Sequence, residues 1–126
     1  MRILLDTHLL LWWLEGSSSL SAQASEMICA PENTVFVSAV SLWEISLKQS
    51  LGKLRLPVDF TERLAAESFE SLPLKASQTQ QVSLLPWYHR DPFDRMLVAQ
   101  AQVEKLVLLT ADEALAAYGE IVHLAR

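Results

Sequence analysis

The chain has 126 residues, of which 51% are hydrophobic, and a net charge of −5. This composition argues against a disordered chain and against a passive coat for nucleic acid, which needs a broad basic surface. The length predicts one compact domain over 1–126, and no run approaches the roughly 18 apolar residues of a membrane span.

The predicted elements of the first half alternate between strands and helices. In chain order they are a strand, two helices, a strand and a helix: Arg2–Asp6, 8–15, a helix from Ser19 or Ser21 to about Cys29, Thr34–Val37 and 39–50. The two strand-like runs are short and apolar, which is typical of strands buried on both faces of a parallel sheet. Ser38 directly follows the second strand and is expected to cap the helix 39–50.

The second half continues the alternation. Its predicted helices and strands are Asp59 to about Phe69, 76–84, Asp91 to about Glu104, Lys105–Thr110, a helix from Thr110 to Gly119, and Ile121–Leu124. Asp59 with Glu62, and Thr110 with Glu113, have the spacing of a capping box. Strands alternating with helices predict an α/β sandwich, in which helices flank a central, mostly parallel and twisted sheet.

The N-terminal segment bears on where in the cell the protein acts. Asp6 interrupts the only N-terminal segment that resembles a signal sequence, and no small-residue cleavage site follows, so we expect a cytoplasmic protein. Cys29 is the single cysteine, which excludes an intramolecular disulfide and a cysteine-rich metal site. We expect Cys29 to be a small buried apolar residue.

Four acids occupy positions where a charge is costly or well placed for a ligand. Asp6 ends the first strand, and Asp112 lies two residues past the strand that ends near Thr110. Glu44 and Asp94 fall beside or on the apolar faces of their helices. Ligands of open α/β sheets bind beyond the carboxyl ends of the strands, so these acids are candidates for one shared site.

Asp6 and Asp112 also have ordinary structural interpretations. Asp6 can cap the helix 8–15, although Thr7 can serve equally well. Asp112 stands in a first helical turn, where the helix dipole favours an acid. Taken alone, Asp112 is evenly balanced between structure and function.

The two helical acids have alternatives as well. Glu44 completes a capping pattern with Ser41 or forms a pair with Lys48, one turn on. The strand that ends near Val37 favours Ser38 over Ser41 as the cap, which leaves Glu44 free for a site. Asp91 immediately precedes a proline and is expected to be mainly a helix cap.

Asp94 lies three positions beyond Asp91 and is aligned with Leu97, Val98 and Ala101 on an inward helix face, which favours a chemical role. Four converging carboxylates would repel one another and raise each other's pKa. A hard divalent cation bound by oxygen ligands removes that cost. The matching chemistry is metal-assisted hydrolysis of a phosphodiester, with either one ion or two.

Five segments carry a resemblance to a known family. They are Leu4–His8, Ser38–Ile45, Leu51–Pro57, His89–Ala101 and Leu109–Asp112, and they span nearly the whole chain in order. Together they resemble PIN-domain proteins, and most of all the VapC-type ribonuclease toxins of bacterial type II toxin–antitoxin systems. The block from Asp91 to Ala101 is the most specific of them.

The resemblance implies a PIN-like three-layer sandwich and Mg²⁺- or Mn²⁺-dependent endonucleolytic cleavage of RNA. It also implies a homodimer and a cognate antitoxin whose C-terminal segment covers the active site. By motif, the family's four acids correspond to Asp6, Glu44, Asp94 and Asp112, and Thr110 matches a frequent Ser or Thr near the metal.

An acidic protein needs local cations to hold RNA. Arg90 and Arg95 flank Asp94 and are the candidates for RNA contacts, although each can equally be an ordinary surface charge. Lys48 and His8 lie near Glu44 and Asp6, while His89 and His123 carry no distinctive signal. The four tryptophans are expected to serve packing rather than base stacking: Trp12, Trp13, Trp43 and Trp87.

Two rival functions remain open from the sequence. A phosphoacceptor receiver module needs paired acids after the first strand, an aspartate at the end of a central strand and a lysine after a late strand. Here Thr7 and His8 follow Asp6, no aspartate ends Thr34–Val37, and Lys105 precedes its strand. A non-catalytic interaction domain is the other alternative, if the acids bind no metal.

Overall fold

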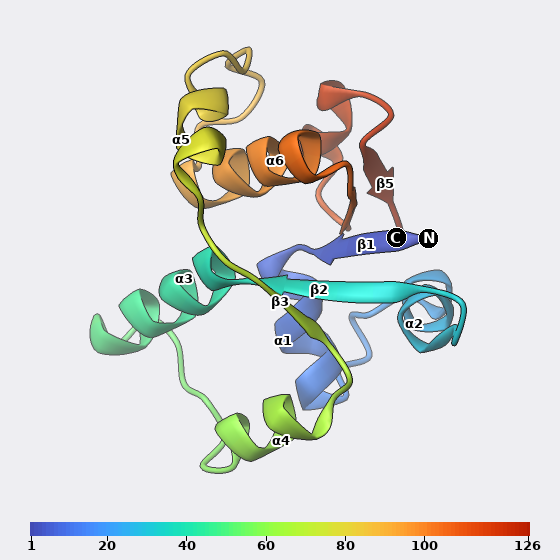
Figure 1. The fold of residues 1–126 in the computed structure, drawn as a ribbon. Coiled ribbons are helices and arrows are strands. Elements are labelled where there is room, and N and C mark those ends of the chain that lie inside the picture. Colours follow the sequence, from blue (N-terminus) through green and yellow to red (C-terminus); the bar gives the residue numbers. More distant parts are fainter.

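Five strands form one parallel sheet in the order β3-β2-β1-β4-β5 in the computed structural model, which describes residues 1–126 (Figure 1). The strands are β1 (Arg2–Leu5), β2 (Thr34–Ser38), β3 (Glu70–Leu72), β4 (Val107–Thr110) and β5 (Val122–Leu124). The helices are α1 (Thr7–Glu15), α2 (Ala22–Cys29), α3 (Ala39–Ser50), α4 (Phe60–Ala66), α5 (Ala76–Val82), α6 (Pro92–Glu104) and the 3-10 helix η1 (Glu113–Tyr118).

The central strand β1 is buried on both of its faces. Ile3 and Leu5 belong to one apolar core, whereas Leu4 between them belongs to a second core on the opposite face. All three side chains are at most 1% exposed. The prediction of strands buried on both faces is therefore confirmed for β1, and its period of two follows from the pleat.

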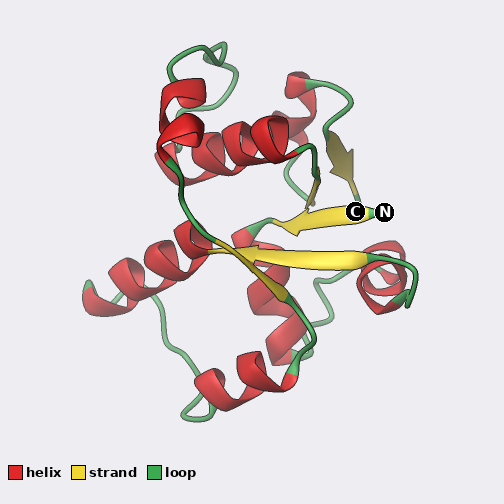
Figure 2. Cartoon of the chain, viewed as in Figure 1, coloured by secondary structure: helices red, strands yellow, loops and turns green.

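Helices cover both faces of the sheet and give three layers. α5, α6 and η1 lie on one side, and α1, α2 and α4 lie on the other (Figure 1; Figure 2). α3 contributes Val40 to one core and Ile45 to the other, which places it at the end of the sheet between the two helical layers. The predicted α/β sandwich with a parallel sheet flanked by helices is confirmed.

Three local predictions were wrong. The helix starting near Asp59 ends at Ala66 rather than Phe69, and the strand β3, which follows it, was not predicted. Asp59 makes no capping bond and instead pairs with Arg63 at 3.0 Å. The helix expected to start at Thr110 is instead the 3-10 helix η1, which starts at Glu113. The Asp112 side chain caps it by accepting a hydrogen bond from Ala114 N.

The expected burial of Cys29 and of two tryptophans was also wrong. Cys29 is the last residue of α2 and is exposed. Trp12 and Trp13 pack against the core as predicted, but Trp43 is 59% exposed and Trp87 is 74% exposed. No helix combines the length and the apolar character that crossing a membrane requires.

Candidate metal centre

The topology brings the four acids to one edge of the sheet. Asp6 follows β1 and Asp112 follows β4, and α3, which carries Glu44, begins directly after β2. α6 carries Asp94 in its first turn and runs back to the start of β4, so its N-terminus lies at this same edge. From β1 the strand order runs one way to β2 and β3 and the other way to β4 and β5. In open α/β sheets, ligands usually bind at the point where the strand order reverses, here between β1 and β4.

Asp6 is buried and held by Thr110. Its side chain is 2% exposed, and Thr110 Oγ1 donates a hydrogen bond of 2.6 Å to Asp6 Oδ2. Asp6 occupies the N-cap position of α1 but makes no side-chain capping bond, so capping does not account for it. Burial raises the pKa of Asp6, and the hydrogen bond from Thr110 opposes that shift.

Glu44 is equally buried and paired with a lysine. It is 2% exposed, and Lys48 Nζ lies 2.6 Å from Glu44 Oε2, as the one-turn spacing predicted. The hydrogen bond to Glu44 raises the pKa of Lys48. Ser38 caps α3 by accepting a hydrogen bond from Val40 N, as predicted, which excludes the alternative in which Ser41 and Glu44 form the cap.

Asp91 caps α6, as predicted from its position before the proline, and Asp94 lies next to it in a buried place. Asp91 Oδ1 accepts hydrogen bonds from Phe93 N at 2.8 Å and Asp94 N at 3.2 Å, which confirms it as the cap of α6. Asp94 is only 8% exposed.

Burial and, to a smaller extent, the negative charges nearby raise the pKa of Asp94 to about 8. In order of their effect these charges are Asp6, Asp91, Glu44 and Asp112. The carboxylates are therefore close enough to act on one another, and the structure brings together the acids that the sequence singled out.

His89 is a member of this cluster that sequence reasoning missed. Its Nε2 lies 3.0 Å from Asp112 Oδ2 and 3.5 Å from Asp94 Oδ2. Its Nδ1 accepts a hydrogen bond from Asp91 N at 3.1 Å, so the neutral ring carries its hydrogen on Nε2. His89 thus donates toward Asp112. Its position two residues before the cap of α6 was the available signal.

Two carboxylate oxygens indicate whether this group of acids is suited to hold a cation. Asp6 Oδ1 and Glu44 Oε1 are buried and have no hydrogen-bond partner. Buried carboxylate oxygens without partners are costly unless a positive charge compensates them. Atoms of His89, Asp94 and Asp112 also lie within 4.8 Å of one another, but the Nε2–H of His89 opposes direct ligation by that ring. The carboxylate oxygens fit a hard divalent cation.

The two arginines expected near RNA differ in their surroundings. Arg90 is exposed. Arg95 is 4% exposed, its guanidinium donates to the carbonyl oxygens of Val82 and Pro86, and it stacks 3.7 Å from the centroid of the Trp87 ring. Arg95 therefore holds the loop before α6 in place, and its burial favours this packing role over a contact with RNA.

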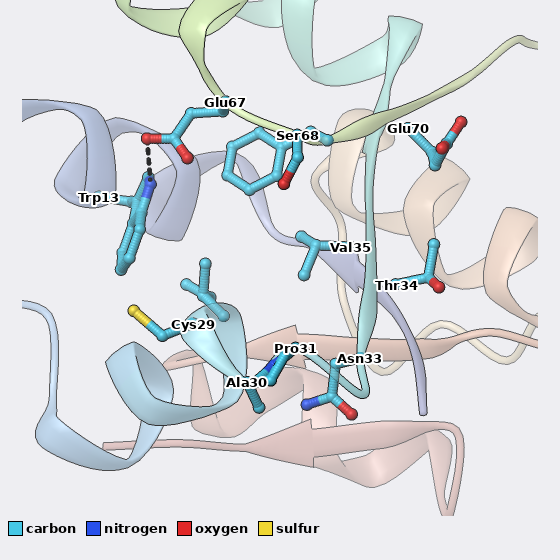
Figure 3. A pocket seen from close by; sticks show the side chains of 12 residues that line it. Trp13, Cys29, Ala30, Pro31, Asn33, Thr34, Val35, Glu67, Ser68 and Glu70 are labelled. Carbon is cyan, nitrogen blue, oxygen red and sulfur yellow. Dashed lines mark hydrogen bonds between the residues drawn. The ribbon is translucent and has the colours of Figure 1, made fainter.

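A hollow of about 420 Å³ lies at the opposite edge of the sheet, near the starts of β2 and β3 (Figure 3). Its lining includes Cys29 and Glu67, and Glu67 accepts a hydrogen bond of 2.9 Å from Trp13 Nε1. None of the four acids lines it. The hollow is thus separate from the metal centre.

The fold is similar to solved toxin–antitoxin structures. A chain of VapBC2 from Rickettsia felis bound to a promoter DNA fragment superposes with a TM-score of 0.72 and 16% identity, over 99% of this chain and 98% of that one. A toxin–antitoxin complex from Klebsiella pneumoniae gives 0.65 and 19%, over 96% and 95%. VapBC-5 from Mycobacterium tuberculosis gives 0.62 and 20%, over 99% and 98%.

Because the sequence identities are only 16% to 20%, these structures show a shared fold and not a shared activity. No curated protein sequence is similar enough to this chain to count as a relative. The sequence pattern of the PIN domain matches residues 3–121, which is most of the chain. The chain belongs to the PIN domain family.

Proposed function

We propose that the protein is a metal-dependent endoribonuclease, and that it is the toxin of a type II toxin–antitoxin pair acting in the cytoplasm. The observation that carries the proposal is the pair of buried, unpartnered oxygens, Asp6 Oδ1 and Glu44 Oε1, beside the protonatable Asp94. PIN-domain membership and the toxin–antitoxin character of similar structures support it.

The metal would be held by Asp6, Glu44 and Asp94, with Asp112 completing the set, and Mg²⁺ or Mn²⁺ suits such oxygen ligands. When bound, the ion supplies charge stabilisation at the scissile phosphate and a water of lowered pKa. Thr110 fixes the orientation of Asp6 through its hydrogen bond to Oδ2, leaving Oδ1 for the ion. His89 restrains Asp112 at Oδ2, while Asp112 Oδ1 accepts a hydrogen bond from Ala114 N.

RNA would approach across the carboxyl edge of the sheet. Arg90 is exposed next to the cap of α6 and would contact a phosphate there. The net charge of −5 leaves no broad basic surface, so affinity for RNA depends on the metal and on a few such local cations.

We further propose a homodimer and a cognate antitoxin as protein partners. Trp43, Leu47 and Leu51 follow one another at one-turn spacing along α3, and they are 59%, 38% and 59% exposed. An apolar stripe of this kind is typical of a surface that another chain covers. Sedimentation as a monodisperse monomer at micromolar concentration, after removal of any antitoxin, would contradict the dimer.

The receiver alternative is less well supported by the positions of the charged residues. Lys105 caps the far end of α6, whereas a receiver needs its lysine near the acids. Asp6 is followed by Thr7, which is buried and donates a hydrogen bond to Ser41, rather than by a second site acid.

Cleavage of RNA with and without metal tests the proposal. Asp6→Asn and Asp94→Asn each should lower the rate of cleavage by Mg²⁺- or Mn²⁺-loaded protein at least about a hundredfold, because each removes a charge that holds the ion. Glu26→Gln, an exposed acid on α2, is the matched control and should cleave normally. Full activity in EDTA, or in both aspartate variants, refutes the proposal.

A further inference from the structure

A second hollow, of about 280 Å³, opens between α1 and α3 and shares a wall with the metal centre. Glu44 lines it from α3, and Thr7, the residue after Asp6, lines it from α1. Its volume is near the lower end of small-ligand pockets, at about 300 Å³. A strand of RNA with its phosphate at Asp6 and Glu44 would place an adjacent nucleotide beside this hollow.

The walls of the hollow suit a flat, partly apolar ring. Leu11, Ile45 and Leu54 contribute apolar side chains to its lining. Trp12 and His8, one turn apart on α1, face it with ring centroids 6.2 Å apart and planes inclined by 49°. His8 is exposed and Trp12 is half-buried, so both rings are open to a ligand. Aromatic rings beside a nucleic-acid site bind bases by stacking.

The charged residues of the hollow suit a single phosphate rather than a polyanion. Lys48 is paired with Glu44, but Lys53 is exposed and takes part in no ion pair or side-chain hydrogen bond. Glu15 also lines the hollow and partly offsets Lys53. The lining therefore combines one free cation, hydrogen-bond acceptors and aromatic faces, which is the chemistry of a nucleotide.

We propose that this hollow binds the nucleotide adjacent to the scissile phosphodiester, with its base against Trp12 and His8 and its phosphate at Lys53. The inference rests on the proposed function, because the adjacent bond is the one that the metal centre would hydrolyse. The RNA strand would then continue on the side of the centre between α1 and α3, where Trp12, His8 and Lys53 would select the nucleotide.

Binding of the four ribonucleoside 5′-monophosphates to the full chain tests this inference without cleavage. NMR titration in EDTA should shift the signals of the Trp12 indole and the Lys53 amide. Lys53→Gln and His8→Ala should each weaken binding by about tenfold. Lys105→Asn removes the same charge at the far end of α6 and should bind like the unaltered chain. Equal binding by Lys53→Gln and the unaltered chain overturns the inference.

Kinetics separate this inference from the proposed function. Lys53→Gln should raise the KM for RNA about tenfold and leave kcat within about twofold. Metal-dependent cleavage with an unchanged KM in Lys53→Gln contradicts the nucleotide site alone. An unaltered chain that binds nucleotides through Lys53 but cleaves no RNA with metal contradicts the proposed function alone.

Discussion

Burial distinguishes three of the four acids of the candidate metal centre from the ordinary surface acids of this chain, whereas the side chain of the fourth, Asp112, is 41% exposed. Asp6 and Glu44 are 2% exposed and Asp94 is 8% exposed. By contrast, the side chains of Glu113 and Asp59, which pair with arginines, are 67% and 56% exposed. A buried carboxylate loses the hydration that stabilises its charge, so the folded metal-free protein carries a free-energy cost at these positions.

That cost gives metal-free stability a definite dependence on pH. The pKa of Asp94 is about 8 in the folded protein, against about 3.9 in an unfolded chain. Between these values the unfolded state releases a proton that the folded state keeps, so the free energy of unfolding falls as the pH rises from about 4 to about 8. Below pH 4, both states are protonated and this loss is absent.

Asp94→Asn should therefore stabilise the metal-free protein at pH 8. Removing a penalty of about 1 kcal/mol or more raises the Tm by at least about 4 °C. Thermal unfolding in EDTA at pH 4 and pH 8 measures the effect, and the gain should vanish at pH 4. A Tm of the variant at pH 8 equal to that of the unaltered chain would show that Asp94 is not held in a costly environment.

His89 provides a second test at the same scale. Because its Nε2–H restrains Asp112 at 3.0 Å, His89→Ala should weaken the binding of Mn²⁺ by about tenfold without preventing folding. His123→Ala is the matched control, because it removes a hydrogen bond to Gln23 that involves none of the four acids. Equal Mn²⁺ affinities in the two variants would remove the positioning role of His89.

Arg95 shows why neighbours in sequence need not share a site. Successive residues of a helix point about 100° apart. Asp94 faces the other acids, whereas Arg95 next to it faces the carbonyl oxygens of Val82 and Pro86. The sequence order alone does not reveal which of two adjacent polar residues faces the edge of the sheet, and a tertiary contact decides it.

Among the elements, α1 and α3 are joined by a buried hydrogen bond close to the centre. Thr7 Oγ1 donates to Ser41 Oγ at 2.9 Å, and these residues are 3% and 1% exposed. Thr7 follows Asp6 directly, and Ser41 lies one turn before Glu44. The bond therefore fixes the distance between the start of α1, which Asp6 directly precedes, and α3, which carries Glu44.

A double-mutant cycle measures this bond. Thr7→Val and Ser41→Ala should each lower the free energy of unfolding by about 1 kcal/mol, and the double variant should lose less than the sum, since one bond is lost once. Denaturant unfolding of the four proteins gives the coupling. Strict additivity would mean that the two hydroxyls act independently.

The elements that the sequence predicted well are those with strong internal patterns. β1 is a short apolar run, and α3 and α6 show apolar periodicity with Ser38 and Asp91 making the capping bonds expected of them. β3 has only three residues and no pattern of its own, and its order comes from pairing with β2. Such an edge strand is visible only once its partner is in place.

At the scale of the whole molecule, parallel topology assembles the centre. The acids lie up to 106 positions apart in the chain, from Asp6 to Asp112, yet the carboxyl ends of β1, β2 and β4 meet at one edge. The alternation of strands and helices predicted the parallel sheet, and the rule that ligands bind beyond the carboxyl ends of its strands made these acids candidates for one shared site. The positions of His89 and the second hollow depend on irregular segments and helix rotation, which periodicity does not encode.

Calorimetric titration of the metal-free protein with Mn²⁺ at pH 8 tests the central claim, that the buried acids together hold a divalent cation. The unaltered chain should bind Mn²⁺ saturably, with affinity that rises as the pH approaches 8 because Asp94 must lose its proton. Asp6→Asn and Glu44→Gln should each weaken binding at least about tenfold, and Glu26→Gln should not. Binding of equal strength in all four proteins would contradict the account.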